Sequence, residues 1–539
     1  MAAVRSFWGW GYQKDELKIS EIKALVRLLG DFVKPETPIK TPPKKDSLNL
    51  QEPKIKLPAS LLKLADTSNQ QRARHCYGRS FKDVVRGLNN EFIDPPDFVL
   101  YPKTVKDVID ILDYSSNKDI AVICYGGGSS VVGGVEFDHE MKQNYAGWIS
   151  MDMTCMDKLN YLDKDSRSAS FQAGILGPGL EEKLKPNNFT LRHFPQSFEF
   201  SSLGGWIATR AGGHFAMGPT HIDDFVESLE VVTPVGTTVT RRLPASGAAS
   251  DENRLWLGSE GMLGIVTSAW IRVQPRTRFV AKADVAFDSF KEGISCLKDI
   301  AQSGLYPSNC RLLDPVEALI NGVYAANKAI LLVGFESYDH EVSSSFRRAK
   351  EICKSHRGVV VSESVLDNEI SRNSNSKQTA GGSWKNSFIK APYFRDALVR
   401  LGLVIETFET AVTWDNFDEL YFNISNEINR YLSEKLNGSQ WVTCRITHAY
   451  PNGLAPYFSV IASCKNNSQT AVWNDIKQIA NETIIKFNGT ITHHHAVGKE
   501  HRDGFKIEKS QLYLDYLKNT KKYFDPKSIL NPGNVIRLL

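Results

Sequence analysis

The chain has 539 residues, of which 42% are hydrophobic, 23% charged and 10% aromatic. These values lie close to the averages of globular proteins, so they exclude a largely disordered or fibrous chain, and the length predicts about two to four domains. Lys and Arg total 65 against 61 Asp and Glu, and the resulting net charge of +4 argues against nucleic acid as a partner.

Neither secretion nor a membrane span is expected. Residues 1–20 lack the apolar core of about 7–15 residues that a signal peptide carries. No apolar stretch approaches the roughly 20 residues needed to cross a bilayer. The eight cysteines form no C-x-x-C pair, a pattern typical of reduced thiols in an intracellular protein. We therefore expect any membrane contact to be peripheral.

Residues 1–94 are assigned as an N-terminal helical and extended segment. Apolar side chains recur at helical spacing over residues 14–32, which predicts an amphipathic helix. Residues 34–56 are rich in Pro and Lys and are interpreted as either an extended strap on the surface or a flexible linker. A second helix is expected around residues 60–64.

Short apolar strands alternate with helices from Pro95 onward. The strand FVLYP, the helix TVKDVIDILDYSSNK and the strand IAVICY give a β-α-β order. The further strands WISMDM, SASFQAG, ESLEVVTPVG and WIRVQP follow up to Pro275. Residues 95–275 are therefore assigned as the first catalytic module.

Residues 276–508 are assigned as a second α+β domain. This domain is expected to contain the strand AILLVGFES, the helix SSSFRRAKEICKSH, the helix-like stretch YFRDALVRLGLVIETF and the strand-like stretch YFSVIAS. Residues 509–539 are assigned as a C-terminal helix, SQLYLDYLKNTKKYF, and a tail that returns to the first module. The predicted fold class is α+β.

Three clusters of small residues carry the first functional signal. Gly126–Ser130 follow a buried strand directly, and glycines there let backbone N–H groups approach a pyrophosphate, while serines add hydroxyl donors. Residues 193–213 (HFPQSFEFSSLGGWIATRAGG) and 256–266 (WLGSEGMLGIV) expose backbone in the same way. A tight turn explains the first cluster equally well, but turns alone do not explain three such clusters in order. The spacing is not the G-x-G-x-x-G of a nicotinamide site.

The order of these clusters resembles the FAD-binding domain of the p-cresol methylhydroxylase (PCMH) and vanillyl-alcohol oxidase flavoproteins. The resemblance implies two α+β FAD subdomains with an α+β cap domain over the isoalloxazine. Some members attach FAD through a His or Cys where this chain has Ser129 and Ser130, so the implied FAD is noncovalent. The implied cofactor-binding residues are Cys124, Tyr125, Gly126, Gly127, Gly128, Ser129, Ser130, His193, Pro195, Gln196, Ser197, Phe198, Glu199, Phe200, Ser201, Thr209, Arg210, Ala211, Gly212, Ser259, Glu260, Gly261, Met262, Leu263, Gly264 and Ile265.

Three consecutive histidines stand out near the end of the chain. The stretch ITHHHAVGK spans residues 491–499, and as a strand it would place His493 and His495 on one face and His494 on the other. Such a group can transfer protons near neutral pH or bind a metal ion, although histidines on a surface would also give this pattern.

Three arginines and a tyrosine lie in apolar or helical contexts. The guanidinium groups of Arg311, Arg395 and Arg445 suit phosphate or carboxylate, while salt bridges on a helix surface are the alternative interpretation for each. Tyr457, in LAPYFSV, would face a pocket by strand alternation or else fill the core.

These segments resemble the alkylglycerone-phosphate synthase (alkyldihydroxyacetonephosphate synthase) family nearly from end to end. The shared patterns are W-G-W-G-Y at Trp8–Tyr12, C-R-L-x-D around Arg311, R-D at Arg395, F-E-T with W-D in Phe408–Asp415, T-C-R at Arg445, Tyr457 before Phe, and the triple histidine. The resemblance implies that Tyr457, His493, His494 and His495 form the acid/base set, that Arg395 and Arg311 stabilise anionic groups, and that His193 lies beside the flavin.

The implied reaction exchanges the acyl chain of 1-acylglycerone 3-phosphate for a long-chain fatty alcohol, which makes the ether bond of ether lipids. It passes through a flavin N5 adduct and involves no net redox change. The resemblance also implies a homodimer, peripheral membrane association and a peroxisomal location. The sequence Arg537, Leu538, Leu539 is not an S-K-L-like signal, so the location follows from the resemblance alone.

Two alternatives remain open at this point. The first is an FAD-dependent D-2-hydroxyacid dehydrogenase, in which the histidine cluster binds metal and an Arg holds the carboxylate. Tyr457 together with three successive histidines favours the synthase. The second is a non-enzymatic scaffold, which would require loss of FAD or of the pocket residues, and those residues are present.

Overall fold

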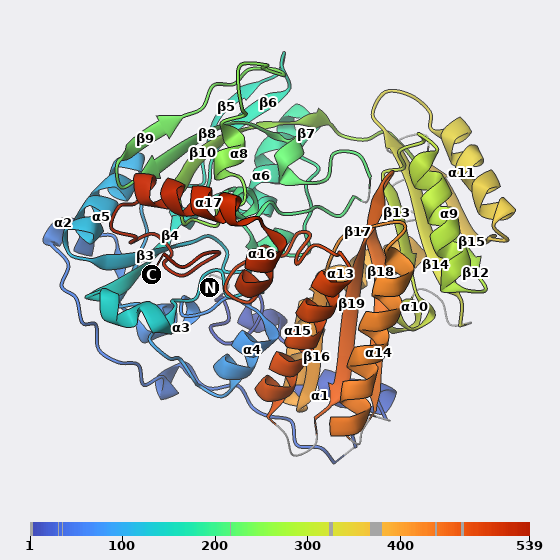
Figure 1. Ribbon diagram of the computed structural model, residues 1–539, viewed down its shortest axis with the longest axis horizontal. Coiled ribbons are helices and arrows are strands. Elements are labelled where there is room, and N and C mark those ends of the chain that lie inside the picture. The colour runs from blue at the N-terminus through green and yellow to red at the C-terminus, as the bar shows by residue number, and fades with distance from the viewer. Residues whose placement is uncertain are drawn as a thin grey trace.

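The computed structural model describes residues 4–30, 32–34, 36–215, 217–322, 327–366, 380–436, 439–464 and 468–538. Figure 1 shows two bodies side by side, one built from the blue, cyan and green segments and the other from the yellow and orange ones. The fold is α+β, as predicted, with separate sheets in the two bodies. No helix among the described residues is long and apolar enough to span a bilayer.

The N-terminal segment runs along the surface of both bodies. Its predicted first helix is α1, and most of the Pro/Lys-rich stretch is an extended strap, because the Lys40 N–H donates to the Arg400 carbonyl at 2.9 Å and Leu48 and Leu50 are buried. The regular elements of this segment are α1 (Ile19–Leu28), α2 (Ala59–Leu62), β1 (Ala65–Asp66), α3 (Asn69–Arg74) and α4 (Phe81–Leu88).

A four-stranded sheet, in the order β1-β2-β4-β3, carries the first glycine cluster. It contains β2 (Phe98–Leu100), β3 (Ile120–Tyr125) and β4 (Gly147–Asp152), which pair in parallel, with α5 (Val105–Asn117) as the crossover helix. The chain returns here near its end, because the Val122 N–H donates to the Ile529 carbonyl at 2.8 Å and the Asn531 N–H donates to the Val122 carbonyl at 2.9 Å.

A five-stranded antiparallel sheet, in the order β5-β6-β10-β8-β9, carries the other two clusters. Leu203, Trp206 and Ile207 of α7 enter the core of this sheet, and so do Leu514 and Leu517 of α17. The elements are β5 (Leu159–Asp163), β6 (Ser168–Gln172), α6 (Gly177–Leu184), β7 (Phe189–Thr190), α7 (Leu203–Thr209), β8 (Val226–Thr233), β9 (Gly236–Val239), α8 (Asn253–Trp256), β10 (Ile265–Arg272), β11 (Gln274–Pro275), α16 (Arg502–Glu508) and α17 (Gln511–Phe524).

The second body is an antiparallel sheet of eight strands in the order β15-β12-β14-β13-β18-β19-β16, with β17 paired to β19. Helices pack on the sheet and share one hydrophobic core with it (Figure 1). The elements are β12 (Phe279–Phe287), α9 (Phe290–Gln302), β13 (Asn309–Leu313), α10 (Pro315–Ile320), β14 (Ala329–Ser337), α11 (Ser343–Ser355), β15 (Val359–Leu366), α13 (Ala380–Arg400), β16 (Leu403–Glu409), β17 (Val412–Thr413), α14 (Phe417–Lys435), β18 (Gln440–Tyr450), β19 (Gly453–Ser463) and α15 (Gln469–Lys486).

One predicted helix in this body is wrong over its second half. The stretch YFRDALVRLGLVIETF is helical only to Arg400, and it continues as strand β16 from Leu403. Gly402 adopts a φ of 80°, a conformation that ends a helix at little cost for glycine and at a high cost for other residues. Because the residues on both sides of this glycine are apolar, the change from helical to strand periodicity could not be recognised in the sequence.

Strand alternation divides the eight-stranded sheet into two faces. Cys310, Leu312, Cys444 and Phe458 point into the helix-covered core. Their neighbours in sequence therefore point to the other face, toward the first body. This opposite face carries the charged residues considered next.

Candidate active site

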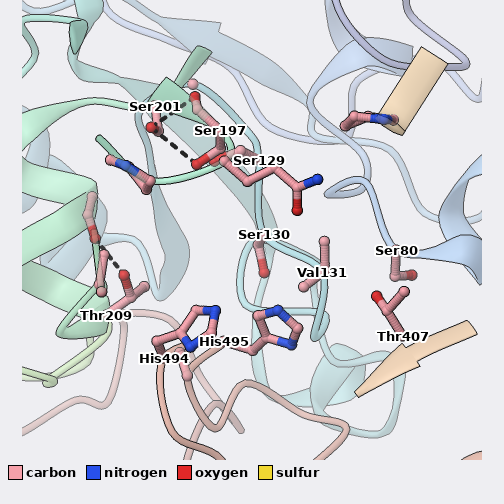
Figure 2. A pocket seen from close by; sticks show the side chains of 18 of the residues that line it. Ser80, Ser129, Ser130, Val131, Ser197, Ser201, Thr209, Thr407, His494 and His495 are labelled. Atoms are coloured by element: carbon pink, nitrogen blue, oxygen red, sulfur yellow. Dashed lines mark hydrogen bonds between the residues drawn. The ribbon is translucent and has the colours of Figure 1, made fainter. Parts of the chain in front are cut away.

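A cavity of about 830 Å³ lies between the two bodies. The three glycine clusters form its first wall, and strands β13, β16, β18 and β19 with helix α13 and the histidine segment form its second wall. In Figure 2, Ser129 and Ser130 lie between the hydroxyls of Ser197 and Ser201 on one side and the rings of His494 and His495 on the other.

The first glycine cluster is packed too tightly for any side chain. A Cβ at Gly126 would collide with the hydroxyl of Ser202, and a Cβ at Gly127 would collide with the carbonyl oxygen of Phe200. Gly128 has a φ of +69°, which favours glycine. The glycines therefore allow close contact between two loops, and the approach of a ligand to their backbone stays a prediction.

The second cluster is fixed by hydrogen bonds among its own hydroxyls. Ser201 Oγ donates to the Ser197 carbonyl at 2.9 Å and accepts from Trp206 Nε1 at 2.7 Å, while Ser202 caps α7 by accepting from the Gly205 N–H at 3.2 Å. Thr209 Oγ1 donates to the Gly205 carbonyl at 2.8 Å. Each of these side chains lines the cavity in a fixed orientation.

Some predicted cofactor residues lie behind this wall and not on it. His193 is 1% exposed and packs against Trp206 and Phe225, burial lowers its pKa to about 4, and it does not line the cavity. Arg210 instead pairs with Asp223 at 2.7 Å near the surface. The predicted residues absent from the cavity wall are His193, Phe198, Glu199, Phe200, Arg210, Met262 and Leu263. Adjacent residues of a loop face opposite sides, and the sequence does not show which side faces the ligand.

The third cluster is joined to the end of the chain through Glu260. This buried carboxylate accepts hydrogen bonds from the backbone N–H groups of Val497 and Gly498 at 2.8 and 2.9 Å and from Asn534 Nδ2 at 3.0 Å. Glu260 also lines the cavity. The predicted contact residue therefore connects three separate segments of the wall.

The first wall fits FAD. It presents bare backbone at Gly126–Gly128 and hydroxyl groups at Ser129, Ser130 and Thr209, which suit a diphosphate and the edge of a flavin ring. The remaining predicted residues on this wall are Cys124, Tyr125, Pro195, Gln196, Ser197, Ser201, Ala211, Gly212, Ser259, Glu260, Gly261, Gly264 and Ile265.

The histidine segment is not the predicted strand. Residues 491–499 form a loop in which the N–H groups of His493, His494 and His495 all donate to Glu409 Oε1, at 2.9, 2.8 and 2.9 Å, as Thr492 Oγ1 also does at 2.9 Å. The hydrogen bonds that a neighbouring strand would supply to a strand are here supplied by one carboxylate, which accepts from four donors. His494 and His495 line the cavity, and His493 lies behind them.

Glu409 holds this loop as an anion. The residue is 1% exposed, and burial would raise its pKa, but the charge of His494 and the hydrogen bonds from His493 and His494 hold the pKa well below its usual range. Glu409 belongs to the F-E-T pattern, yet no role was predicted for it. The sequence feature that could have indicated a role for Glu409 is a glutamate at a buried position of an otherwise apolar strand, because a buried charge needs partners.

A chain of hydrogen bonds leads from the histidines toward the protein surface. His494 Nδ1 and His493 Nδ1 lie 3.0 Å apart, His493 Nε2 and the Tyr450 hydroxyl 2.7 Å, and the Tyr450 hydroxyl and His221 Nε2 3.1 Å. Tyr450 and His221 are partly exposed. Every member can both donate and accept a hydrogen bond, so this chain can conduct protons.

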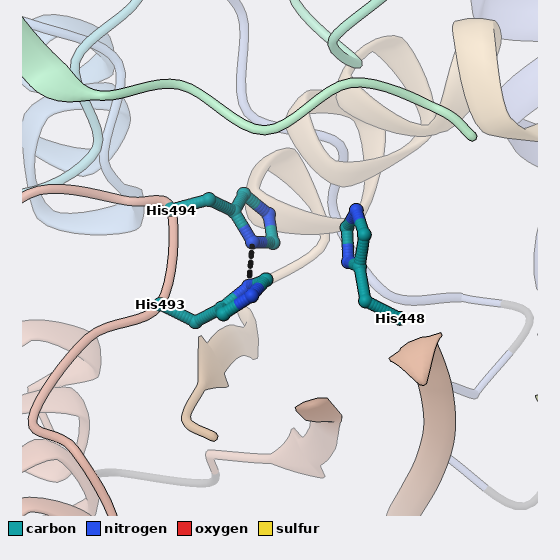
Figure 3. Close-up of side chains that lie close together, drawn as sticks. All are labelled: His448, His493 and His494. Carbon is teal, nitrogen blue, oxygen red and sulfur yellow. Dashed lines mark hydrogen bonds between the residues drawn. The ribbon is translucent and has the colours of Figure 1, made fainter. Parts of the chain in front are cut away.

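His448 of β18 completes the histidine cluster. Figure 3 shows its ring facing those of His493 and His494, which come from the loop. One nitrogen from each of the three rings lies within 4.8 Å of the others, a spacing that would also suit a metal ion. His448 was not among the predicted residues.

Tyr457 lies in a row of side chains across three strands. It is the register partner of Arg445 on β18 and of Glu409 on β16. The Arg445 guanidinium covers its ring at 3.9 Å, and the rings of His494 and His495 lie 6.2 and 5.4 Å from it. Burial raises the pKa of Tyr457, and the charge of Arg445 acts in the opposite direction.

The three arginines converge on the same cavity. Arg311 is 2% exposed and donates to the carbonyl of His214 at 3.0 Å; burial, then the charge of Arg445, lowers its pKa to about 9. Arg445 forms an ion pair with Glu317. Arg395 donates to Asp396 at 2.8 Å and to the Arg79 carbonyl at 2.6 Å. Two of the three guanidinium groups are thus paired with carboxylates, and guanidinium groups in a cavity suit anionic ligands through their paired N–H donors.

The cavity also has an apolar part, which the sequence did not reveal. Residues from α1 and its C-cap, and from α10, α13, β18 and β19, meet there although they lie far apart in the chain. They are Leu25, Leu29, Leu319, Ile320, Leu398, Trp441 and Ile461.

Comparison with known proteins defines the class. A model of the FAD binding domain matches residues 96–241, and a model of the C-terminal domain of FAD linked oxidases matches residues 276–535. A solved structure of p-cresol methylhydroxylase shares the fold, with a TM-score of 0.67 at 12% identity over 88% of this chain and 94% of that one. The chain therefore belongs to the FAD-linked oxidase class of flavoproteins and is an FAD-dependent enzyme, as the three clusters predicted.

Within this class the chain is similar to alkyldihydroxyacetonephosphate synthases. The Dictyostelium discoideum protein is 29% identical over 478 residues, which cover 86% of this chain and 77% of that protein. A solved synthase structure superposes with a TM-score of 0.80 at 23% identity over 98% of both chains. The mitochondrial D-lactate dehydrogenase of Arabidopsis thaliana, a more distant relative, is 24% identical over 474 residues. The predicted resemblance is confirmed.

Proposed function

We propose that the chain is an alkylglycerone-phosphate synthase, which replaces the acyl chain of 1-acylglycerone 3-phosphate with a long-chain fatty alcohol. One observation carries the proposal: a single cavity joins the FAD wall, three arginines, the Tyr457 and histidine set, and an apolar region. This reaction needs each of these parts. A D-2-hydroxyacid substrate would leave the apolar region without a ligand.

The arginines and the apolar wall bind the substrate. We assign the phosphate and the departing carboxylate to Arg311, Arg395 and Arg445, because guanidinium groups hold such anions through paired hydrogen bonds. The apolar residues hold the acyl and alkyl chains and exclude water from them. FAD, when bound, supplies an electron-accepting ring beside the substrate carbon.

Tyr457 and the histidines move protons. We assign Tyr457 as the acid/base group nearest the substrate, with His494 and His495 around its ring. The fatty acid product ionises at neutral pH, so one proton leaves the site in each turnover. The hydrogen bonds from His494 through His493 and Tyr450 to His221 offer a route for this proton.

The test uses purified holoenzyme with palmitoylglycerone phosphate and then hexadecanol. We expect alkylglycerone phosphate and free palmitate in equal amounts, and a loss of both with Tyr457→Phe. Reduction of the flavin by D-lactate without ether product would establish the dehydrogenase instead. A stoichiometric metal ion at His448, His493 and His494 would support that second outcome.

The cellular setting of the enzyme is part of the same proposal. We propose a peroxisomal homodimer that associates peripherally with membranes, and the division at residues 94, 275 and 508 as its domain boundaries. Lys44 and Lys45 of the strap are exposed, which favours contact with anionic lipid. Unchanged vesicle binding after both lysines are replaced by Ser would contradict a role for the strap in membrane contact.

A further inference from the structure

The N-terminal W-G-W-G-Y motif lies against the cofactor wall. Arg5 and Tyr12 form an antiparallel bridge around it, closed by a hydrogen bond from the Ser6 N–H to the Gly11 carbonyl at 2.9 Å. A Cβ at Gly9 would lie 2.6 Å from Asp396 Oδ2, and Trp10 lines the cavity. The motif is therefore a compact turn held against both bodies of the protein.

Arg5, at the start of this turn, contacts two of the three cofactor loops. Its Nη2 donates to the Gly127 carbonyl at 3.2 Å, and its guanidinium covers the Phe200 ring at 4.2 Å. Trp10 and Tyr12 pack edge-on against the same ring, at 5.6 and 5.2 Å. Arg5 thus lies directly behind the backbone of the first glycine cluster.

The guanidinium of Arg5 lies near other cations. No Asp or Glu of the described segments lies within ion-pair distance of its guanidinium, and the nearby charged groups include Arg74 and Arg79, which are also cationic. Burial, then Arg74, lowers the pKa of Arg5 to about 10, so the side chain is protonated at neutral pH. Arg5 is partly buried, and its Nε is buried without a hydrogen-bond partner, so a bound anion would relieve the cost of holding the charge there.

The geometry of the peptide bond shows how Arg5 can act on the cavity. The C=O and N–H groups of a trans peptide point in opposite directions. Arg5 binds the C=O of Gly127, so the N–H of Gly128 points away from Arg5, and Gly128 lines the cavity. A cationic donor on the C=O also polarises the peptide and strengthens its N–H as a donor.

We propose that Arg5 is a positioning residue for the diphosphate of FAD. It orients and polarises the Gly127–Gly128 peptide, and its charge balances that of the diphosphate from behind the loop. The proposal rests on the FAD-dependent class alone and does not depend on which lipid the enzyme converts.

The test measures flavin binding and not activity. Arg5→Gln and Arg5→Met remove the charge, and the Met variant keeps an apolar stem against Phe200. We expect the Kd for FAD, measured by flavin fluorescence after removal of bound FAD, to rise about tenfold or more in both variants, since a charged hydrogen bond contributes roughly that much. Arg5→Lys retains the charge and is expected to recover most of the affinity.

Riboflavin separates an effect on the diphosphate from a general effect on the fold, because it carries the ring without the phosphates. We expect the Kd for riboflavin to change less than twofold in every Arg5 variant. Arg72→Gln is the matched control, since Arg72 is 3% exposed and donates to the Pro96 and Gln51 carbonyls away from the cavity. Equal weakening of FAD and riboflavin, unchanged FAD binding in Arg5→Gln, or equal losses in Arg5→Lys and Arg5→Gln would each overturn the proposal.

Discussion

The two walls of the cavity use different parts of the polypeptide. The first wall presents backbone and hydroxyl groups, and loop-to-loop packing at Gly126–Gly128 fixes its shape. The second wall presents charged side chains from a sheet, and buried carboxylates such as Glu409 and Glu317 fix their positions. Close packing of the backbone therefore determines the structure of the first wall, whereas the balance of charges determines that of the second. Substitutions that alter only one of these properties should affect one wall and spare the other.

The largest effect is expected from Gly127→Ala. The new Cβ would collide with the Phe200 carbonyl, so the first and second loops would have to separate. We expect loss of bound FAD and a decrease in the free energy of unfolding of about 3 kcal/mol, as in other overpacked sites. Flavin absorbance and denaturant unfolding measure the two effects. Gly247→Ala, where a Cβ meets no atom within 4 Å, should change neither.

Glu409→Gln tests the catalytic wall through charge alone. The amide oxygen can still accept hydrogen bonds from the loop, but the anion beside the histidines is lost. We expect kcat to fall about 100-fold while FAD binding stays unchanged, the size of effect seen when one charged partner of a catalytic set is removed. If the Gln variant is as active as the wild type, the hydrogen bonds from the backbone of the histidine loop are sufficient for activity and the negative charge is not needed.

Tyr450→Phe interrupts the hydrogen-bonded chain and leaves the rings in place. We expect kcat to fall about tenfold, with a larger solvent isotope effect, because the proton must take a slower route. The control is Tyr421→Phe, since Tyr421 is a partly buried tyrosine that packs against Phe417 and Phe458. If both variants lose the same activity, the chain from His493 to His221 carries no protons.

A smaller effect is expected from Asp396→Asn. Asp396 accepts hydrogen bonds from Arg395 at 2.8 Å and from the Trp10 N–H at 2.6 Å, and the amide can preserve only part of this arrangement. We expect KM for the phosphate substrate to rise about fivefold with little change in kcat, as for loss of uniform binding. If KM rises equally for an acyl substrate that lacks the phosphate, Asp396 does not act on phosphate binding.

The smallest effect concerns stability at acidic pH. His501 is 1% exposed, and burial lowers its pKa to about 3 from its usual value of 6.5. The unfolded chain therefore binds the proton more strongly, so the stabilisation is present above pH 6.5 and is lost as the pH falls toward 3. From pH 7.5 to 5.5, we expect this group to cost about 1 kcal/mol of unfolding free energy. Measured by urea unfolding, the decrease in unfolding free energy between these two pH values should be smaller by that amount in His501→Gln. An unchanged decrease would contradict the contribution of His501.

The sequence predicted the residues that line the first wall better than those that meet on the second wall, for a physical reason. The glycine clusters are contiguous, so their positions could be predicted, although the side that faces the ligand could not, as His193 shows. On the second wall, Arg445, Tyr457 and Glu409 meet only through the pairing of three strands. The resemblance gave Tyr457 as a candidate, but the positions of Glu409, His448 and Tyr450 beside it could be known only from the pairing of the strands.

The return of the chain to strand β3 also affects how the protein is made. Val122 is hydrogen-bonded to Ile529 and Asn531, so the edge strand β3 of the first body takes its last partner from residues translated after the whole eight-stranded sheet. The second body can therefore fold while the first still lacks part of its sheet. During synthesis on the ribosome the first body should be completed last, and a chain released early would carry a finished eight-stranded sheet beside an unfinished first body.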